Sequence, residues 1–87
     1  MVSQKVIVSN PSGIHARPAS VLVKTTAKCK SNVIIMVGEK KIVAKSILNV
    51  MAAAIKCGTE IEVQCDGENE VEDLKEVVAL IESGLGE

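Results

Sequence analysis

The chain contains no phenylalanine, tyrosine or tryptophan, although 47% of its 87 residues are hydrophobic. Its core therefore has to be assembled from small aliphatic side chains. A chain of this length has room for a single hydrophobic core and buries only a moderate share of its surface. We therefore expect residues 1–87 to form one domain.

The charge of the chain is nearly balanced, with 10 Lys and Arg residues, 11 Asp and Glu residues and a formal net charge of −1. Proteins that bind nucleic acids usually present a basic surface, and many of them stack aromatic side chains on the bases. This composition offers neither feature. We therefore expect no nucleic-acid partner.

The cysteines and the N-terminus both predict a cytoplasmic protein. Cys29, Cys57 and Cys65 are odd in number and show no CxxC spacing, so we expect reduced, partly buried thiols. A zinc site would need all three cysteines and His15 to converge, which their spacing does not indicate. We predict no metal and no cofactor.

Residues 1–5 lack the apolar core of a signal peptide, and no apolar run approaches the roughly 20 residues of a membrane span, so we expect no membrane insertion.

Hydrophobic periodicity and turn residues divide the chain into four strands and three helices. Strands are predicted at residues 2–8, 32–37, 40–44 and 60–65, with helices between 16 and about 30, over 47–55 and over 70–83. Strict alternation in 60–65 predicts a strand with one face on the core and one toward solvent. The order β-α-β-β-α-β-α thus predicts an α+β fold in which one face of an antiparallel sheet carries the helices.

Two of these helices have amphipathic stripes, and two have capping residues. Ser46 is a good N-cap for the helix 47–55, and Asn69 with Glu72 predicts a capping box for the last helix. The stripe of the first helix is Ala19, Leu22, Val23, Thr26 and Ala27, and that of the last helix is Val71, Leu74, Val78 and Ile81.

The sole histidine, His15, lies in the run Ser12-Gly13-Ile14-His15-Ala16-Arg17-Pro18-Ala19, at the predicted start of the first helix. Pro18 suits an opening turn, because its missing N–H has no intrahelical partner there. The first N–H groups of a helix lack intrahelical acceptors and attract anions. A neutral imidazole, with an unperturbed pKa of about 6.5, is a nucleophile near neutral pH. A phosphate on His15 would lie among the amides of Ala16 and Arg17 and beside the Arg17 guanidinium.

The run around His15, together with Ala44-Lys45-Ser46-Ile47 and Gly84-Leu85-Gly86-Glu87, resembles the HPr family, the histidine-containing phosphocarriers of the sugar phosphotransferase system. The resemblance covers essentially the whole chain. It implies an open-faced β-sandwich of four antiparallel strands covered by three helices. It also implies that His15 accepts phosphate from enzyme I, charged by phosphoenolpyruvate. The resemblance further implies that His15 passes the phosphate through Nδ1 to the A domain of a sugar-specific enzyme II, while Arg17 steadies it. Such a protein is a monomeric carrier without turnover of its own.

Ser46 has two compatible interpretations. As a residue before an apolar helix it is an N-cap. The segment Lys45-Ser46-Ile47 also resembles the low-GC Gram-positive branch of the family, in which HPr kinase/phosphorylase modifies this serine and the catabolite control protein binds the product. A phosphate dianion is favourable at a helix N-terminus, so the helix is expected to survive the modification. The effect would then arise at the surface, through repulsion of acidic partners and recruitment of a basic one.

The helix after Ser46 also carries a predicted docking surface and departs from the family pattern. Val50 and Ala54 are predicted to be core residues. Asn49 and Ala54 stand where glycine is common in the Gram-positive branch, and Cys57 stands where lysine is frequent. By resemblance, the residues that face partners are Ile47, Leu48 and Met51, extended on the first helix by Ser20 and Lys24.

Three alternatives differ from the carrier in what they require. An HPr-like regulator that works only through Ser46 lacks the acceptor histidine, whereas His15 is present here. A small acylphosphatase-like enzyme needs a phosphate loop and a group that positions water, and steady release of inorganic phosphate from an acyl phosphate would reveal it. An RNA-binding α/β module is disfavoured by the charge and the missing aromatics.

Overall fold

The computed structural model of the chain describes residues 1–14 and 16–86. The order β-α-β-β-α-β-α predicted from the sequence is confirmed. Along the chain the elements are β1 (Val2–Ile7), α1 (Ala16–Ala27), β2 (Asn32–Val37), β3 (Lys40–Val43), α2 (Ile47–Ala52), β4 (Glu60–Asp66) and α3 (Glu70–Glu82).

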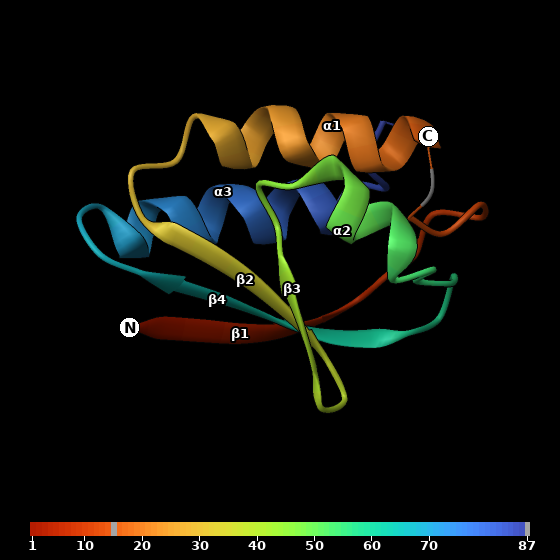
Figure 1. The fold of residues 1–87 in the computed structure, drawn as a ribbon, viewed down its shortest axis with the longest axis horizontal. Coiled ribbons are helices and arrows are strands. Elements are labelled where there is room, and N and C mark those ends of the chain that lie inside the picture. The colour runs from red at the N-terminus through yellow and green to blue at the C-terminus, as the bar shows by residue number, and fades with distance from the viewer. Residues whose placement is uncertain (15, 87) are drawn as a thin grey trace.

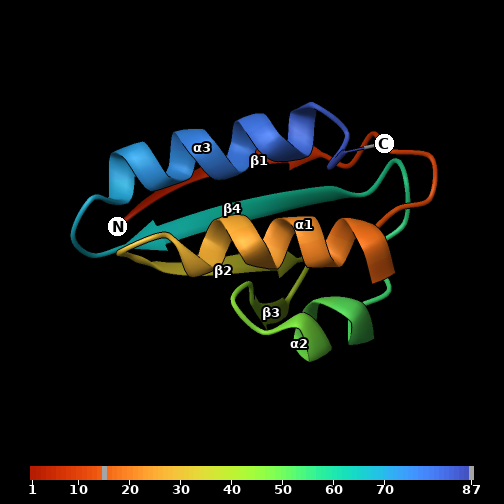
Figure 2. The same cartoon turned by 90° about the horizontal axis from the view of Figure 1, so that it is seen from above.

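The four strands form one antiparallel sheet in the order β1-β4-β2-β3, so β4 lies between the first two strands of the sequence. The helices lie on one face of this sheet, and the other face is open (Figure 1). Seen from above, α3 lies over β1 and α1 lies over β2, while α2 lies beside α1 next to the β3 edge (Figure 2). The predicted open-faced α+β architecture is confirmed.

The core between the sheet and the helices is aliphatic, as the composition requires. In β4 the buried residues Ile61, Val63 and Cys65 alternate with partly exposed ones, which confirms the predicted two-faced strand. Val50, one of the two core residues predicted in α2, is fully buried. In the described part of the chain, no helix is long and apolar enough to cross a membrane.

The predicted ends of two helices were wrong. The first helix ends at Ala27 rather than near Cys29, because Lys28 N–H and Cys29 N–H bond to the carbonyls three residues earlier and tighten the last turn. Helix α2 ends at Ala52 rather than at Ile55. Ala54 has a φ of +51° and is exposed, so the prediction that it belongs to the core was also wrong.

The predicted stripes were partly wrong as well. In α1 the buried stripe residues are Ala19, Leu22 and Thr26, whereas Ala27 is exposed. In α3 the side chain of Val71 is 50% exposed. Asp73 turns inward in that first turn instead, because its carboxylate binds the chain between α1 and β2. The buried residues of α3 are Asp73, Leu74, Val77, Val78 and Ile81.

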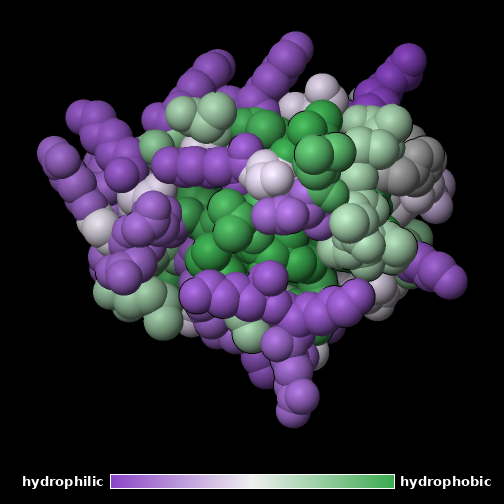
Figure 3. All heavy atoms as spheres, in the orientation of Figure 1, coloured by the Kyte–Doolittle hydropathy of each residue, from purple (hydrophilic) through white to green (hydrophobic). Residues whose placement is uncertain are grey.

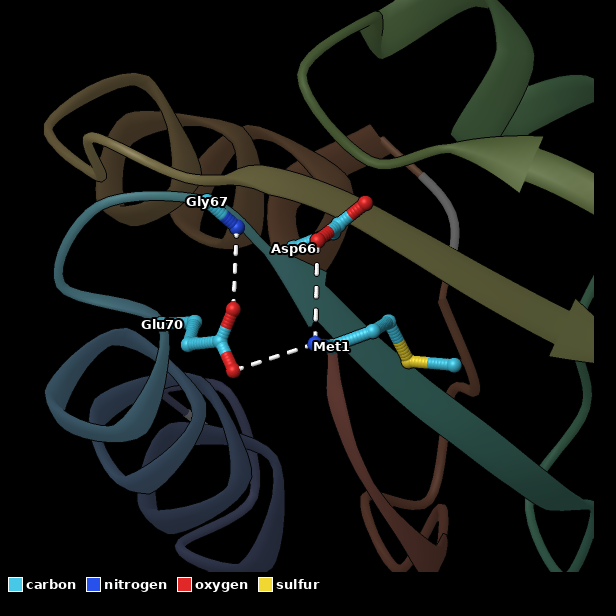
Figure 4. Close-up of polar contacts among 4 residues, drawn as sticks. All are labelled: Met1, Asp66, Gly67 and Glu70. Carbon is cyan, nitrogen blue, oxygen red and sulfur yellow. Dashed lines mark hydrogen bonds and ion pairs between the residues drawn. The ribbon is translucent and has the colours of Figure 1, made fainter.

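The predicted capping box at the start of α3 does not form. Asn69 has a φ of +68° and no side-chain capping bond, and its amide donates instead to Asp73 Oδ1 at 3.2 Å. Glu70 Oε1 accepts a hydrogen bond from Gly67 N–H at 3.1 Å (Figure 4). The Met1 ammonium group lies 3.1 Å from Glu70 Oε2 and 3.7 Å from Asp66 Oδ1. The Gly67 amide first, and then the Met1 ammonium group, lower the pKa of Glu70.

Candidate functional site

The loop between β1 and α1 is closed by hydrogen bonds within its own residues. Gly13 N–H donates to the Asn10 carbonyl at 3.0 Å, and the Asn10 side-chain amide donates back to the Gly13 carbonyl. The side chain that makes this bond is only 1% exposed. A buried amide bonded to a main-chain carbonyl fixes the local backbone, because breaking the bond would leave polar groups unsatisfied.

The same loop rests on the segment that follows α2. Ile14 N–H donates to the Ile55 carbonyl at 2.7 Å, and the two residues form an isolated antiparallel bridge. One residue beyond β1, Val8 N–H bonds to the Thr59 carbonyl at 3.0 Å and the Val8 carbonyl accepts from Gly58 N–H at 2.7 Å. Figure 2 shows the two loops side by side at one end of the molecule. Residues 55–59 therefore form the support of the loop 8–14.

Gly13 is required where these two segments approach each other closely. Its φ is +69°, a region that residues with a Cβ rarely adopt. A Cβ at this position would lie 2.5 Å from the Ile55 carbonyl oxygen and 3.0 Å from the Lys56 Cα. Both atoms belong to the main chain and cannot rotate away. The glycine is thus needed for its conformation and for its missing side chain.

The loop leads directly into the first turn of α1. His15, the predicted phosphate acceptor, lies outside the described residues. Ala16 and Arg17 are exposed, whereas Pro18 and Ala19 are buried and anchor the helix start in the core. Within residues 1–14 and 16–86, Arg17 has no ion-pair partner. The first turn therefore presents main-chain N–H groups and a guanidinium group to solvent, an arrangement suited to an anion.

The prediction that Ser46 caps α2 is confirmed. Its φ and ψ are −106° and 113°, and its hydroxyl oxygen accepts from Asn49 N–H at 3.3 Å. Two bonds tie the chain before this cap to α1 and to the turn that follows it. Thr26 Oγ1 donates to the Ala44 carbonyl at 2.7 Å, and Lys45 Nζ donates to the Cys29 carbonyl at 3.1 Å. The half-buried Ser46 is thereby held beside α1.

Helix α2 presents three large apolar side chains to solvent next to α1. Leu48 is 77% exposed, and Ile47 and Met51 are 39% and 41% exposed. Figure 3 shows hydrophobic atoms in the middle of the face occupied by α2 and β3, with hydrophilic side chains around them. On α1, Ser20 is partly exposed and Lys24 is exposed. The contact between α1 and α2 brings this apolar surface beside the helix that begins at the loop.

The cysteines are free, and two of the three are buried. Cys29 and Cys65 are buried, whereas Cys57 is exposed with its thiol 3.7 Å from the Ser9 carbonyl oxygen. Burial raises the pKa of the Cys29 thiol to about 11 and also raises that of Cys65. Both buried thiols are therefore protonated at neutral pH and weak as nucleophiles.

Three residues that shape the site were not predicted as site residues from the sequence. Asn10 and Gly13 belong to a segment that reads as a turn, and nothing in that pattern shows the buried amide bond between them. Ile55 reads as the end of an alanine-rich helix. Its role as acceptor for Ile14 N–H depends on a contact between residues 41 positions apart in the chain, which no local pattern reveals.

A family model described as the PTS HPr component phosphorylation site matches residues 2–83. The phosphocarrier protein HPr of Mycoplasma capricolum is 52% identical over 67 residues, which cover 77% of this chain and 75% of that protein.

Two solved structures are also similar. The first is an HPr protein of Thermoanaerobacter tengcongensis, with 36% identity and a TM-score of 0.95 over 100% of this chain and 98% of that one. The second is the Bacillus subtilis catabolite-repression protein Crh, with 37% identity and a TM-score of 0.77 over 97% of each chain; its crystal structure is a dimer with a swapped domain.

Proposed function

Because this chain belongs to the HPr family of phosphocarrier proteins, we propose that its sole histidine, His15, carries a phosphoryl group. In this proposal His15 accepts the group from enzyme I and passes it to the A domain of a sugar-specific enzyme II. The observation that carries the proposal is the position of this histidine in the chain, between a loop fixed at Gly13 and Ile14 and the exposed first turn of α1.

In the transfer, the chain's own groups supply a nucleophile and a site for the incoming charge. The Nδ1 lone pair of a neutral His15 forms a bond to phosphorus while the bond from phosphorus to the donor breaks. The phosphoryl oxygens then meet the main-chain N–H groups at Ala16 and Arg17 and the Arg17 guanidinium. Onward transfer reverses these steps on an acceptor, so the protein is a carrier and not an enzyme.

The carrier proposal is tested by incubating the protein with phosphoenolpyruvate and enzyme I. We expect one acid-labile, base-stable phosphate by intact mass, and none on the His15→Ala variant. An acid-labile phosphate on histidine can be assigned to His15 because the chain has one histidine. Arg17→Ala keeps the acceptor and is expected to be phosphorylated on the order of tenfold or more slowly.

The controls separate a failed assay from a failed proposal. The same enzyme I must phosphorylate a known HPr under identical conditions, and circular dichroism must show that each variant is folded. If the folded wild-type protein then takes up no phosphate, or if His15→Ala keeps an acid-labile phosphate, the carrier proposal is wrong. Steady release of inorganic phosphate from an acyl phosphate would instead favour the hydrolase alternative.

We further propose that Ser46 is a regulatory phosphorylation site for HPr kinase/phosphorylase and that the phosphorylated form binds the catabolite control protein. Its hydroxyl caps α2 beside the exposed side chains of Ile47 and Leu48, so a phosphate there would place a dianion on the apolar surface. The similarity to Crh, a protein of catabolite repression, supports this role.

Replacing Ser46 with aspartate is expected to leave α2 folded and to slow phosphorylation by enzyme I on the order of tenfold, because an anion is tolerated at a helix N-terminus but repels an acidic partner. Ser3→Asp is the matched control, since it adds the same charge on β1, at the opposite edge of the sheet from β3. Initial rates of phosphorylation measure the difference. Equal rates for the two variants would contradict an effect through this surface.

The remaining parts of the proposal follow from the same site. Enzyme I and the enzyme II A domains would dock on the apolar surface of α2 and the adjoining face of α1. We propose that the carrier acts as a cytoplasmic monomer of one HPr-like domain with reduced thiols and without a metal or other cofactor. The docking residues are Ser20, Lys24, Ile47, Leu48 and Met51.

A further inference from the structure

Ala54, two residues beyond the end of α2, has a strained main-chain conformation. Its φ of +51° lies in the left-handed region, where a Cβ crowds the neighbouring carbonyl. The turn before it is regular, with Ala53 N–H bonded to the Asn49 carbonyl at 3.2 Å and Ala54 N–H to the Met51 carbonyl at 3.1 Å. A non-glycine residue remains in this region only when the surrounding structure holds it there.

The contacts that hold Ala54 lie immediately after it, in the support of the loop 8–14. Ile55 is buried, and its carbonyl accepts the Ile14 N–H at 2.7 Å. Two residues on, the Cys57 main-chain nitrogen lies 3.2 Å from the position of a Cβ on Gly13. The direction in which the chain leaves Ala54 therefore sets the position of the atoms against which Gly13 and Ile14 pack.

The other end of α2 is fixed independently. The bond from Thr26 to the Ala44 carbonyl, at 2.7 Å, ties the chain before α2 to α1, and the bond from Lys45 to the Cys29 carbonyl, at 3.1 Å, ties it to the turn after α1. Between this anchor and Ile55, the chain contains only the short helix α2 and the left-handed turn. The turn at Ala54 is thus the joint between a fixed helix and the support of the loop.

We propose that Ala54 is a positioning residue for the phosphoryl-acceptor loop: its left-handed turn aims the Ile55 carbonyl at Ile14 N–H and so sets the entry of the chain into α1. The phosphoryl part of this statement rests on the proposed function. The positioning part concerns the Ile14–Ile55 contact alone and is tested without phosphate.

The test compares substitutions at Ala54 with the same substitutions at Ala52, an exposed helical position of α2. Glycine adopts positive φ without strain, so Ala54→Gly should raise the folding equilibrium constant on the order of fivefold, whereas Ala52→Gly should lower it by a similar factor. Valine is β-branched and tolerates positive φ poorly, whereas asparagine tolerates it well. The folding equilibrium constant of Ala54→Val should therefore be well below that of Ala54→Asn.

The positioning readout is hydrogen exchange of the Ile14 amide, followed by NMR beside the Val63 amide of the central strand β4. Ala54→Val should speed exchange at Ile14 on the order of tenfold more than at Val63, because the Ile14–Ile55 contact opens locally. Ala54→Asn should restore slow exchange. Ala52→Gly should leave Ile14 within about twofold of the wild type.

Phosphorylation by enzyme I is then measured on the folded variants. We expect Ala54→Val to lower the rate on the order of tenfold and Ala54→Asn to restore it. If Ile14 exchange is the same in Ala54→Val, Ala54→Asn and Ala52→Gly, the positioning role is wrong. If Ala54→Val does not fold, Ala54→Gly decides, since it must slow exchange at Ile14 more than at Val63. If Ile14 exchange responds as expected but the wild-type protein takes up no phosphate, the carrier proposal is wrong. The positioning of Ile14 by Ala54 is then still supported.

Discussion

Replacing Gly13 with alanine is expected to lower the free energy of unfolding by about 3 kcal/mol, the combined cost of a left-handed alanine and an overpacked contact. The new Cβ would meet the Ile55 carbonyl oxygen at 2.5 Å. Because this oxygen and the nearby Lys56 Cα are main-chain atoms, the loop 8–14 and residues 55–59 must separate. Separation breaks the Ile14–Ile55 hydrogen bond, and we expect phosphorylation by enzyme I to fall by at least tenfold.

Gly38 provides a matched control for this prediction. It has a φ of +60°, close to that of Gly13, but nothing lies within 4 Å of a Cβ built on it. Gly38→Ala should therefore carry only the conformational cost, about 1 kcal/mol, and leave phosphorylation unchanged. Urea unfolding of the three proteins measures the stabilities, with the slope m as a check on the two-state analysis. If Gly13→Ala and Gly38→Ala lower the free energy of unfolding equally, the close approach at Gly13 does not contribute to stability.

The sequence predicted the strands better than the ends of the helices, and the reason is physical. Alternation in β4 reflects a sheet with one buried face, so the pattern and the burial of Ile61 and Val63 have the same origin. The cap at Ser46 is equally local, because a hydroxyl bonds to an amide three residues away. Such features depend on neighbours in the chain and are readable from it.

The predictions that were wrong concern features that depend on segments distant in the chain. Alanine-rich residues 52–55 favour a helix by propensity. Ile55 instead pairs with Ile14 in a bridge outside α2, and Ala54 before it adopts a left-handed turn. Asn69 fits a capping box, but its amide is bonded to Asp73. His15 and Arg17 could be named from the sequence as candidates. The support of the loop 8–14 could not, because it comes from residues 55–59.

Replacing Asp73 with alanine is expected to lower the free energy of unfolding by about 3 kcal/mol, because it leaves several buried donors without an acceptor. The carboxylate is 4% exposed, and its Oδ2 accepts from Lys30 N–H at 3.1 Å, from Ser31 N–H at 3.0 Å and from the Ser31 hydroxyl at 2.7 Å. These bonds join α3 to the chain between α1 and β2. The start of α3 lies at the opposite end of the molecule from the start of α1 (Figure 1). The folded variant should thus still accept phosphate at the wild-type rate.

Glu72→Gln is the matched control, because Glu72 is an exposed acid in the same first turn of α3. It removes one negative charge near the helix N-terminus and should cost only about 0.5 kcal/mol. Thermal or urea unfolding of both variants at neutral pH tests the comparison. A loss at Asp73 no larger than that at Glu72 would contradict a structural role for the buried carboxylate.

The same carboxylate predicts a pH dependence with a definite sign. The Ser31 hydroxyl, and then the main-chain amides and Asn69, lower the pKa of Asp73, against the opposing effect of its burial. A pKa that is lower in the folded state than the unfolded value of about 3.9 gives stability that is fully present above the unfolded pKa and is lost as the pH falls through the folded one. The stability difference between the wild type and Asp73→Asn should therefore be largest near neutral pH and shrink as the pH falls below about 4. A difference that stays constant from neutral pH to about pH 2 would mean that the carboxylate stabilises the fold equally in its charged and protonated forms, and that its hydrogen bonds do not depend on the charge.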